Sequence, residues 1–245
     1  MHTLDDPARG DELRRTILGK PTLKRFYMEI YGKYADCLAR CPADGLAVEL
    51  GSGGGFAKTV IPEILTTDVI PYEDVERVVD ATRMPFENAS VRLIAMLNVF
   101  HHIPDVAAFL REAVRCVMPG GRVLIVDQHP GWIGKPILRY LHHEPFRPDA
   151  ATWSFETEGP LSGANGALAW MVFARDYQRF ETEFRDLRLL RYEPFAPLRY
   201  WLCGGLKKWS LLPDSAWHAG TVLDRTLLRI SGNFGSFVEI EIVRL

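Results

Sequence analysis

Cysteine is scarce in this chain, and no two cysteines form a CxxC pair. The four cysteines lie at positions 37, 41, 116 and 203, so the sequence predicts neither a zinc knuckle nor a disulfide framework and favours a reducing compartment. An uninterrupted apolar run of about 18 residues is also absent, and the first residues lack the basic and apolar segments of a secretory leader. We therefore expect a cytoplasmic protein with no transmembrane segment.

The chain also lacks an excess of charge of one sign. Its formal net charge is −2, so the basic footprint of a dedicated nucleic-acid binder is missing, although a local basic patch stays possible. What is present is an ordinary globular composition, with 47% hydrophobic and 24% charged residues. A chain of 245 residues suits one domain with an elaborated lobe.

The first half of the chain alternates apolar strands with helices. Apolar residues at three- and four-residue steps over residues 22–40 predict an amphipathic helix, which we assign to an N-terminal helical cover over 1–42. From there we expect strands at 46–50, before Asp68, at 78–79, at 91–99 and at 123–126, with helices over 56–65 and 104–117. This order predicts an open α/β sheet with helices on both faces and its chemistry at the carboxyl ends of the strands.

The second half of the chain differs in composition. All six tryptophans follow Pro130, and we expect substrate-lobe insertions within residues 131–235 of a main domain spanning 43–245, whose sheet is finished by strands at 184–192 and 237–243. Residues 198–212 mix bulky apolar side chains with Arg199, Lys207 and Lys208. Such a segment suits a buried lid, a cavity for an amphiphile or a contact with an anionic membrane surface.

A glycine-rich turn follows the first strand of the main domain. Gly51, Gly53 and Gly55 form G-x-G-x-G, and Phe56 stands where the dinucleotide fingerprint G-x-G-x-x-G needs its third glycine. No Gly-Lys-Ser/Thr follows, which excludes a P-loop. The turn can still bring backbone N–H groups and a helix N-terminus close to a charged ligand.

Three acids accompany this turn. Glu49 lies two residues before it and suits an ammonium group, Asp68 ends the next strand at a spacing typical of a ribose-binding acid, and Asp80 is placed to accept from a purine amine. The ligand that these acids require carries an amine, a ribose and an adenine, and needs no pyrophosphate. Each acid could also be an ordinary solvated or paired carboxylate.

With these features the chain resembles the class I S-adenosylmethionine-dependent methyltransferases, in particular the small-molecule group of the ubiquinone-biosynthesis type. The resemblance covers residues 44–130 and is carried by Val48-Glu-Leu-Gly-Ser-Gly-Gly-Gly-Phe56, Thr67-Asp68, Val79-Asp80-Ala81, Asn98-Val-Phe-His-His-Ile-Pro104 and Met118-Pro-Gly-Gly-Arg-Val-Leu-Ile-Val126. It implies a Rossmann-like sheet of seven strands with the last antiparallel, and S-adenosyl-L-methionine as cofactor. Glu49 stands where Asp is commoner. The cofactor-binding residues that we expect are Glu49, Gly51, Ser52, Gly53, Gly55, Asp68, Val69, Asp80, Ala81, Asn98, Val99 and Tyr31.

Methyl transfer from a sulfonium needs an acceptor held in line and little acid–base machinery. His101 and His102 follow the fourth strand and are candidate bases for an alcohol acceptor, although one could instead cap the next helix while the other packs. We expect no metal, because the histidine-rich set fits no standard spacing and the neighbouring His142 and His143 would diverge on a helix. That set is Asp127, His129, His142, His143 and Glu144.

The sequence leaves the acceptor open. Aromatic-rich segments suit a saccharide, a quinone-like ring or a lipid-linked molecule, with peripheral membrane contact possible. Nucleic-acid amines are disfavoured because the residues after Asn98 lack the two prolines that hold a flipped base. The prediction is methyl transfer to a small or amphiphilic acceptor, with O-methylation weakly favoured. The alternatives are an NAD-type oxidoreductase and a non-catalytic, cofactor-retaining binding or regulatory subunit.

Overall fold

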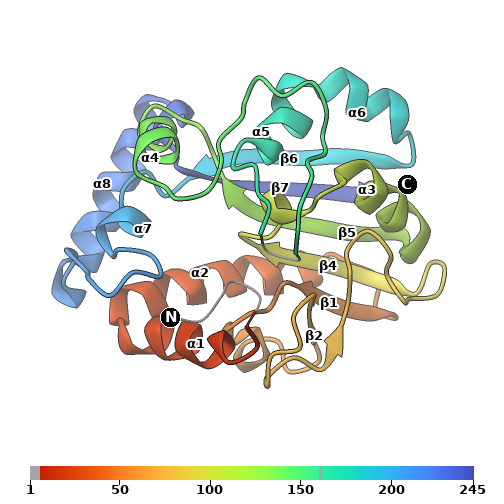
Figure 1. Ribbon diagram of the computed structural model, residues 1–245, viewed down its shortest axis with the longest axis horizontal. Coiled ribbons are helices and arrows are strands. Elements are labelled where there is room, and N and C mark those ends of the chain that lie inside the picture. Colours follow the sequence, from red (N-terminus) through yellow and green to blue (C-terminus); the bar gives the residue numbers. More distant parts are fainter. Residues whose placement is uncertain (1–5, 160–161) are drawn as a thin grey trace.

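The computed structural model describes residues 6–159 and 162–245 and is built on one seven-stranded sheet (Figure 1). The strands follow the order β3-β2-β1-β4-β5-β7-β6. All pairings from β3 to β5 are parallel, whereas β7 runs antiparallel to both β5 and β6. The predicted α/β sheet with an antiparallel last strand is therefore confirmed. Its strands are β1 (Leu46–Leu50), β2 (Leu65–Asp68), β3 (Arg77–Val78), β4 (Val91–Leu97), β5 (Val117–Gln128), β6 (Leu187–Phe195) and β7 (Phe237–Arg244).

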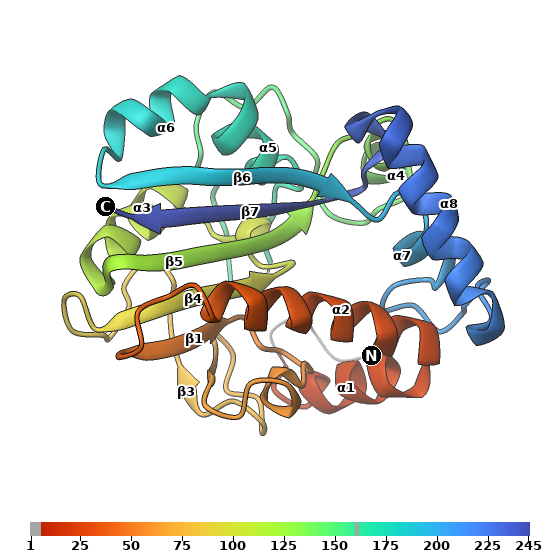
Figure 2. The same ribbon diagram turned by 180° about the vertical axis from the view of Figure 1, so that it is seen from behind.

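The helices cover both faces and one end of this sheet (Figures 1 and 2). Helix α2 packs across β4 and β5 on one face, and α3 packs on β5 from the other. Helices α4, α7 and α8 gather beyond the end of the sheet toward which β6 runs. The helices are α1 (Arg9–Gly19), α2 (Pro21–Leu38), α3 (Val106–Cys116), α4 (Gly134–Tyr140), α5 (Leu168–Trp170), α6 (Tyr177–Glu183), α7 (Arg199–Leu202) and α8 (Trp217–Ile230), with short turns at η1 (Ala57–Thr59), η2 (Phe100–His102), η3 (Met171–Arg175), η4 (Asp214–Ala216) and η5 (Gly232–Phe234).

The strand alternation divides the core into two apolar clusters. Val48 and Leu50 of β1 join the cluster under α3, whereas Ala47 joins the cluster under α2. Because side chains along a strand alternate between faces, Glu49 points to the same face as Ala47. The sequence thus places one acid of β1 beneath the tyrosine-bearing helix α2.

Two segments differ from the sequence prediction. The helix expected over 56–65 is only the single turn η1, because Pro62 lies inside the segment and cannot continue a helix. Within the predicted N-terminal helical cover, only the helix over 22–40 was expected and α1 was not; its buried residues are Gly10 and Ile17. Its backbone lies directly on the glycine turn, where a Cβ on Gly54 would come within 2.4 Å of Arg14 N.

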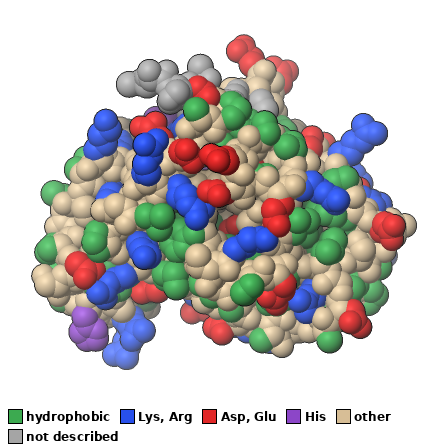
Figure 3. Space-filling view, turned by 90° about the horizontal axis from the view of Figure 1, so that it is seen from below, with side chains coloured by type: hydrophobic (Ala, Val, Ile, Leu, Met, Phe, Trp, Pro, Cys, Tyr) green, Lys and Arg blue, Asp and Glu red, His purple; other side chains and the backbone are tan. Residues whose placement is uncertain are grey.

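The surface matches the balanced composition. Lysine, arginine and acidic side chains are interspersed on the face seen from below, with no block of one sign (Figure 3). Among the described residues, no helix is long and apolar enough to cross a bilayer.

Candidate active site

The turn between β1 and η1 requires glycine for steric reasons. Gly51 has φ of +69°, a left-handed conformation that side chains disfavour. A Cβ there would lie 2.2 Å from Val99 Cγ2, and one on Gly55 would lie 2.6 Å from the Tyr31 hydroxyl. The bare backbone therefore allows β4 and α2 to approach the turn closely.

Glu49 is a buried carboxylate with unused hydrogen-bonding capacity. Only 3% of the residue is exposed, and its Oε2 atom has no partner within the described part of the chain. Burial raises the pKa of Glu49 to about 7, although a hydrogen bond with Ser52 lowers it in part. An acid kept in this state is poised to receive a cation that enters the cavity beside it.

The other two acids brace the backbone around the turn. Asp68 Oδ2 accepts from Gly53 N at 2.9 Å, and its Oδ1 accepts from Ile70 N at 3.0 Å. Burial raises the pKa of Asp68, and these backbone donors offset part of that rise. Asp80 is exposed, and its Oδ1 accepts from Thr82 N and Thr82 Oγ1, each at 2.7 Å.

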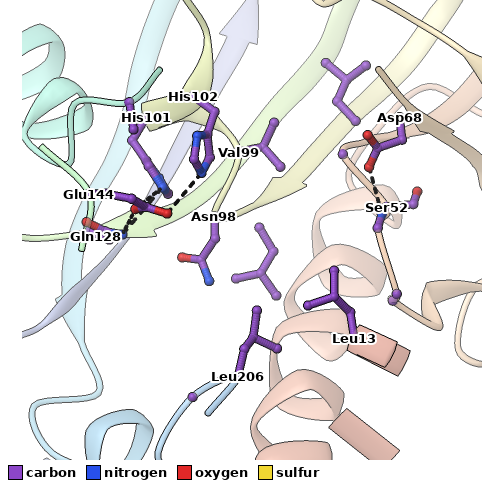
Figure 4. Close-up of a pocket in the computed structure, with 18 of the residues that line it drawn as sticks. Leu13, Ser52, Asp68, Asn98, Val99, His101, His102, Gln128, Glu144 and Leu206 are labelled. Atoms are coloured by element: carbon purple, nitrogen blue, oxygen red, sulfur yellow. Dashed lines mark hydrogen bonds and ion pairs between the residues drawn. The ribbon is translucent and has the colours of Figure 1, made fainter. Parts of the chain in front are cut away.

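Tyr31 and Asn98 complete the cradle from two sides. The Tyr31 hydroxyl accepts from Phe56 N at 3.0 Å, so its hydrogen bond orients the glycine turn. Asn98 has φ of +55° at the end of β4, and its buried Oδ1 is without a partner within the described residues. In Figure 4, Asn98 and Val99 lie between Asp68 and Ser52 on one side and the histidines on the other.

All of these residues line one cavity of about 650 Å³. Its wall includes each predicted cofactor-binding residue together with His101 and His102. The sequence analysis missed Gln128 and the α1 residues Arg9, Leu13 and Ile17, which also line it. For the α1 residues the only signal is the pair of apolar residues four apart, which is too short a pattern to predict a cavity wall.

A hydrogen-bonded cluster occupies the end of the cavity beyond Asn98 (Figure 4). His101 lies between two carboxylates: Nδ1 is 2.6 Å from Asp127 Oδ1, and Nε2 is 3.1 Å from Glu144 Oε2. Burial lowers the pKa of His101, but the charges of Asp127 and Glu144 outweigh it and raise the pKa to about 10. Burial raises the pKa of Glu144, but hydrogen bonds from His101 and His102 hold it well below its ordinary value.

The structure corrects two expectations about this cluster. His142 and His143 do not diverge on a helix, because α4 ends at Tyr140 and both ring systems approach Glu144. Neither His101 nor His102 caps the following helix, whose cap is Asp105, accepting from Ala108 N at 2.9 Å.

Asp127 and His129, the other members of the histidine-rich set, lie in different surroundings. Asp127 is fully buried behind His101. His129 turns away to Tyr192, with Nδ1 at 3.0 Å from the hydroxyl.

Among the described residues, the unpartnered acceptors at the glycine end fit a ligand that carries an amine. The unpartnered Glu49 Oε2 can accept from an ammonium, and the Asn98 amide oxygen offers a second buried acceptor nearby. Residues 48–125 also match the family model described as methyltransferase domain. The match takes in most of β1, the glycine turn, β2, β4 and most of β5, which is about a third of the chain. The missing third glycine of the turn disfavours a dinucleotide at this site.

Two individual proteins are similar to this chain over very different lengths. The chloroplastic tocopherol O-methyltransferase of Arabidopsis thaliana is 42% identical over 50 residues, which cover 20% of this chain and 14% of that protein. The alignment thus spans a small part of the curated relative. The fold resembles the crystal structure of geranyl diphosphate C-methyltransferase from Streptomyces coelicolor A3(2) with Mg²⁺, geranyl diphosphate and S-adenosyl-L-homocysteine. That likeness has a TM-score of 0.54 and 17% identity, covering 91% of this chain and 80% of the other.

Asp68→Ala is expected to weaken binding of S-adenosylhomocysteine by about 5- to 150-fold, or about 1 to 3 kcal/mol. The change removes the carboxylate that we expect to accept from the ribose hydroxyls, and it also releases the Gly53 and Ile70 amides. Titration calorimetry measures the effect, with the exposed Asp44→Ala as a control. Unchanged affinity in Asp68→Ala would remove this carboxylate from the site.

Proposed function

We propose that this chain transfers a methyl group from S-adenosylmethionine to a hydroxyl oxygen of a small or amphiphilic acceptor by in-line displacement. The cofactor supplies an electrophilic sulfonium methyl, so the displacement itself needs no metal. We assign cofactor binding to the residues named from the sequence, with Glu49 for the amine and Asp68 and Asp80 for the adenosine. His101 and His102 contact the acceptor.

The observation that carries this proposal is that a single continuous cavity is lined by different kinds of residues at its two ends. The glycine turn and its acids line one end, and the polar cluster of His101, His102 and Glu144 lines the other. A volume of about 650 Å³ lies well within the range of roughly 300–1,000 Å³ seen for ligand sites. An acceptor between the two ends would meet the methyl group while water is excluded.

An apolar rim supports an acceptor with an apolar body. Nine of the fifteen exposed large hydrophobic side chains of the described residues lie on α4 and α8, just before α4, or in the segments after α4 and α7. Leu141, Leu206 and Trp209 among them also line the cavity. We infer that an amphiphile enters here, with Lys207 and Lys208 beside the entrance for an anionic headgroup or membrane surface. The nine are Trp132, Tyr140, Leu141, Leu206, Trp209, Leu211, Val222, Leu223 and Ile230.

A methyl-transfer screen with methyl-labelled S-adenosylmethionine tests the proposal. Candidate acceptors are alcohols and phenols on apolar bodies, free and in anionic vesicles, compared with soluble sugars and with methyl ethers of the same alcohols. We expect label to enter the free hydroxyl compounds and not their ethers, with mass spectrometry locating the new methyl on oxygen. If S-adenosylhomocysteine binds but no acceptor is labelled, a non-catalytic, cofactor-retaining subunit replaces this proposal; if NADH binds in its place, an oxidoreductase does.

A further inference from the structure

Four histidines converge on one carboxylate at the acceptor end of the cavity. Glu144 Oε2 is 3.1 Å from His101 Nε2 and 3.5 Å from His142 Nδ1, while its Oε1 is 3.4 Å from His102 Nε2 and 3.6 Å from His143 Nε2. His101 and His102 come from the turn after β4, whereas the other three residues follow α4. Segments about forty residues apart thus bring their ligand-type atoms to a single point.

With neutral histidines, no hydrogen or cation would lie between the ring nitrogens of His101 and His102 and the carboxylate of Glu144. His101 Nδ1 lies 2.6 Å from Asp127 Oδ1, and His102 Nδ1 lies 3.1 Å from the Gly163 carbonyl oxygen. Both oxygens only accept, so each Nδ1 carries a hydrogen. A neutral imidazole then directs the lone pair of Nε2 at Glu144, which also only accepts. A cation must therefore lie between these groups, either as added protons or as a metal ion.

The spacing of the atoms suits a metal ion. Zinc binds imidazole nitrogen and carboxylate oxygen at about 2.0–2.2 Å, so two ligands at right or tetrahedral angles lie about 3.0–3.4 Å apart. The two nearest nitrogen–oxygen distances, 3.1 Å for His101 and 3.4 Å for His102, match these edges. The ligand atoms of His101, His102 and Glu144 all lie within 4.8 Å of one another.

The groups behind the histidines match the usual support of a metal site. A ligating histidine commonly donates its other N–H to a carboxylate or a backbone carbonyl, which fixes the ring. Asp127 provides the carboxylate for His101, and Gly163 provides the carbonyl for His102. Asp127 is itself fixed, because its oxygens also accept from the backbone N–H groups of His101 at 3.2 Å and Gln128 at 2.7 Å.

We infer that His101, His102 and Glu144 form a binding site for a divalent first-row transition metal, with zinc the best match to their donors. The inference departs from the metal-free site expected from the sequence, and its role rests on the proposed function. An acceptor hydroxyl bound to the metal would release its proton to water more readily. Its oxygen then forms the new O–C bond as the S–C bond breaks and S-adenosylhomocysteine leaves.

Metal binding is measured first on the wild-type protein, independently of activity. Protein stripped with a chelator is titrated with Zn²⁺ in competition with a coloured indicator, and separately with Co²⁺ while visible absorption is recorded. We expect one equivalent of Zn²⁺ to bind and one equivalent of Co²⁺ to give the d–d bands of nitrogen and oxygen ligation. Absence of both the bound equivalent and the bands overturns the inference.

Matched variants locate the metal. Asp127→Asn is expected to weaken Zn²⁺ binding by about 10- to 100-fold, and His102→Ala by more, whereas the exposed His218→Ala on α8 leaves it unchanged. Equal binding in wild type and His102→Ala contradicts the assignment. S-adenosylhomocysteine affinity is measured on each protein: a variant that keeps this affinity is folded, and a wild type that lacks it contradicts the proposed function whether or not Zn²⁺ binds.

Discussion

Glu49→Gln is expected to weaken S-adenosylhomocysteine binding by about 10- to 150-fold and at the same time to stabilise the ligand-free protein above pH 7. The loss of affinity follows from replacing a charge-assisted hydrogen bond, worth about 1.5 to 3 kcal/mol, with a neutral one. The gain in stability follows because the ionised carboxylate of Glu49 is buried and Oε2 has no partner in the described chain. Calorimetric titration and thermal unfolding measure the two effects.

The ionisation of Glu49 makes both the stability of the protein and its affinity for S-adenosylhomocysteine depend on pH. Its pKa rises from 4.5 to about 7 on folding, so the stability that the protonated form contributes is fully present below pH 4.5 and is lost as pH rises to 7. The shift corresponds to roughly 3 kcal/mol. Since an ammonium group needs the ionised acid, affinity for the cofactor product should fall about tenfold per pH unit below 7.

The control is Glu87→Gln, which changes an exposed acid and should alter neither affinity nor stability. Glu49→Gln should flatten the stability profile between pH 4.5 and 7 and remove the fall in affinity. A variant that binds S-adenosylhomocysteine as tightly as wild type at pH 8 would show that Glu49 does not meet the amine.

Arg199→Met is expected to destabilise the protein by about 3 to 5 kcal/mol. Arg199 at the start of α7 is 6% exposed, and its Nε donates to Asp224 Oδ2 of α8 at 2.8 Å. Its Nη1 donates to Glu29 Oε1 of α2, also at 2.8 Å. Removing the guanidinium leaves the buried Asp224 charge uncompensated, which is the costly way to break a buried ion pair. Denaturant unfolding, monitored by tryptophan fluorescence, measures the loss.

A double variant separates this cause from simple loss of packing. Arg199→Met combined with Asp224→Leu removes both charges and should recover most of the stability lost in Arg199→Met. The exposed Arg229→Met on α8 should change stability little. If the double variant is as unstable as the single one, the ion pair does not hold α7 and α8 together. Because α7 carries the cavity residues Tyr200 and Trp201, this pair also positions the acceptor wall.

The grouping of residues at the glycine end of the cavity could be predicted because its parts are local in the sequence. Glu49 and the glycines lie within seven consecutive residues, and Asp68 ends the neighbouring strand. Parallel strands bring their carboxyl ends to one edge, so a strand pattern alone places these groups together. The prediction of a helix after the glycine turn was wrong. The apolar residues of that segment suit a helix or an irregular loop equally well, and the structure forms only the short turn η1 before Pro62.

The acceptor end could not be predicted in the same way. His101 and His102 were recognised as candidates from their place after β4, but Glu144 was set aside with its histidine neighbours because its segment was read as a helix. Two features of the structure bring Glu144 into the cavity. Helix α4 ends at Tyr140, and the chain after it returns to the turn that carries His101. The spacing of apolar residues along the sequence does not predict that one segment folds back onto a distant one.

By itself, the sequence determined the α/β alternation and the grouping of the glycine turn with its acids, because each depends on alternation along a strand or on short spacing between neighbours. The antiparallel last strand was implied by the family resemblance. The tertiary structure alone decided that α1 closes over Gly54 and that Asp127 lies behind His101. It also brought Glu144 between the histidines. These contacts join segments far apart in the chain, and their position is set by how the segments pack against a common sheet and not by any preference of the residues for a local conformation.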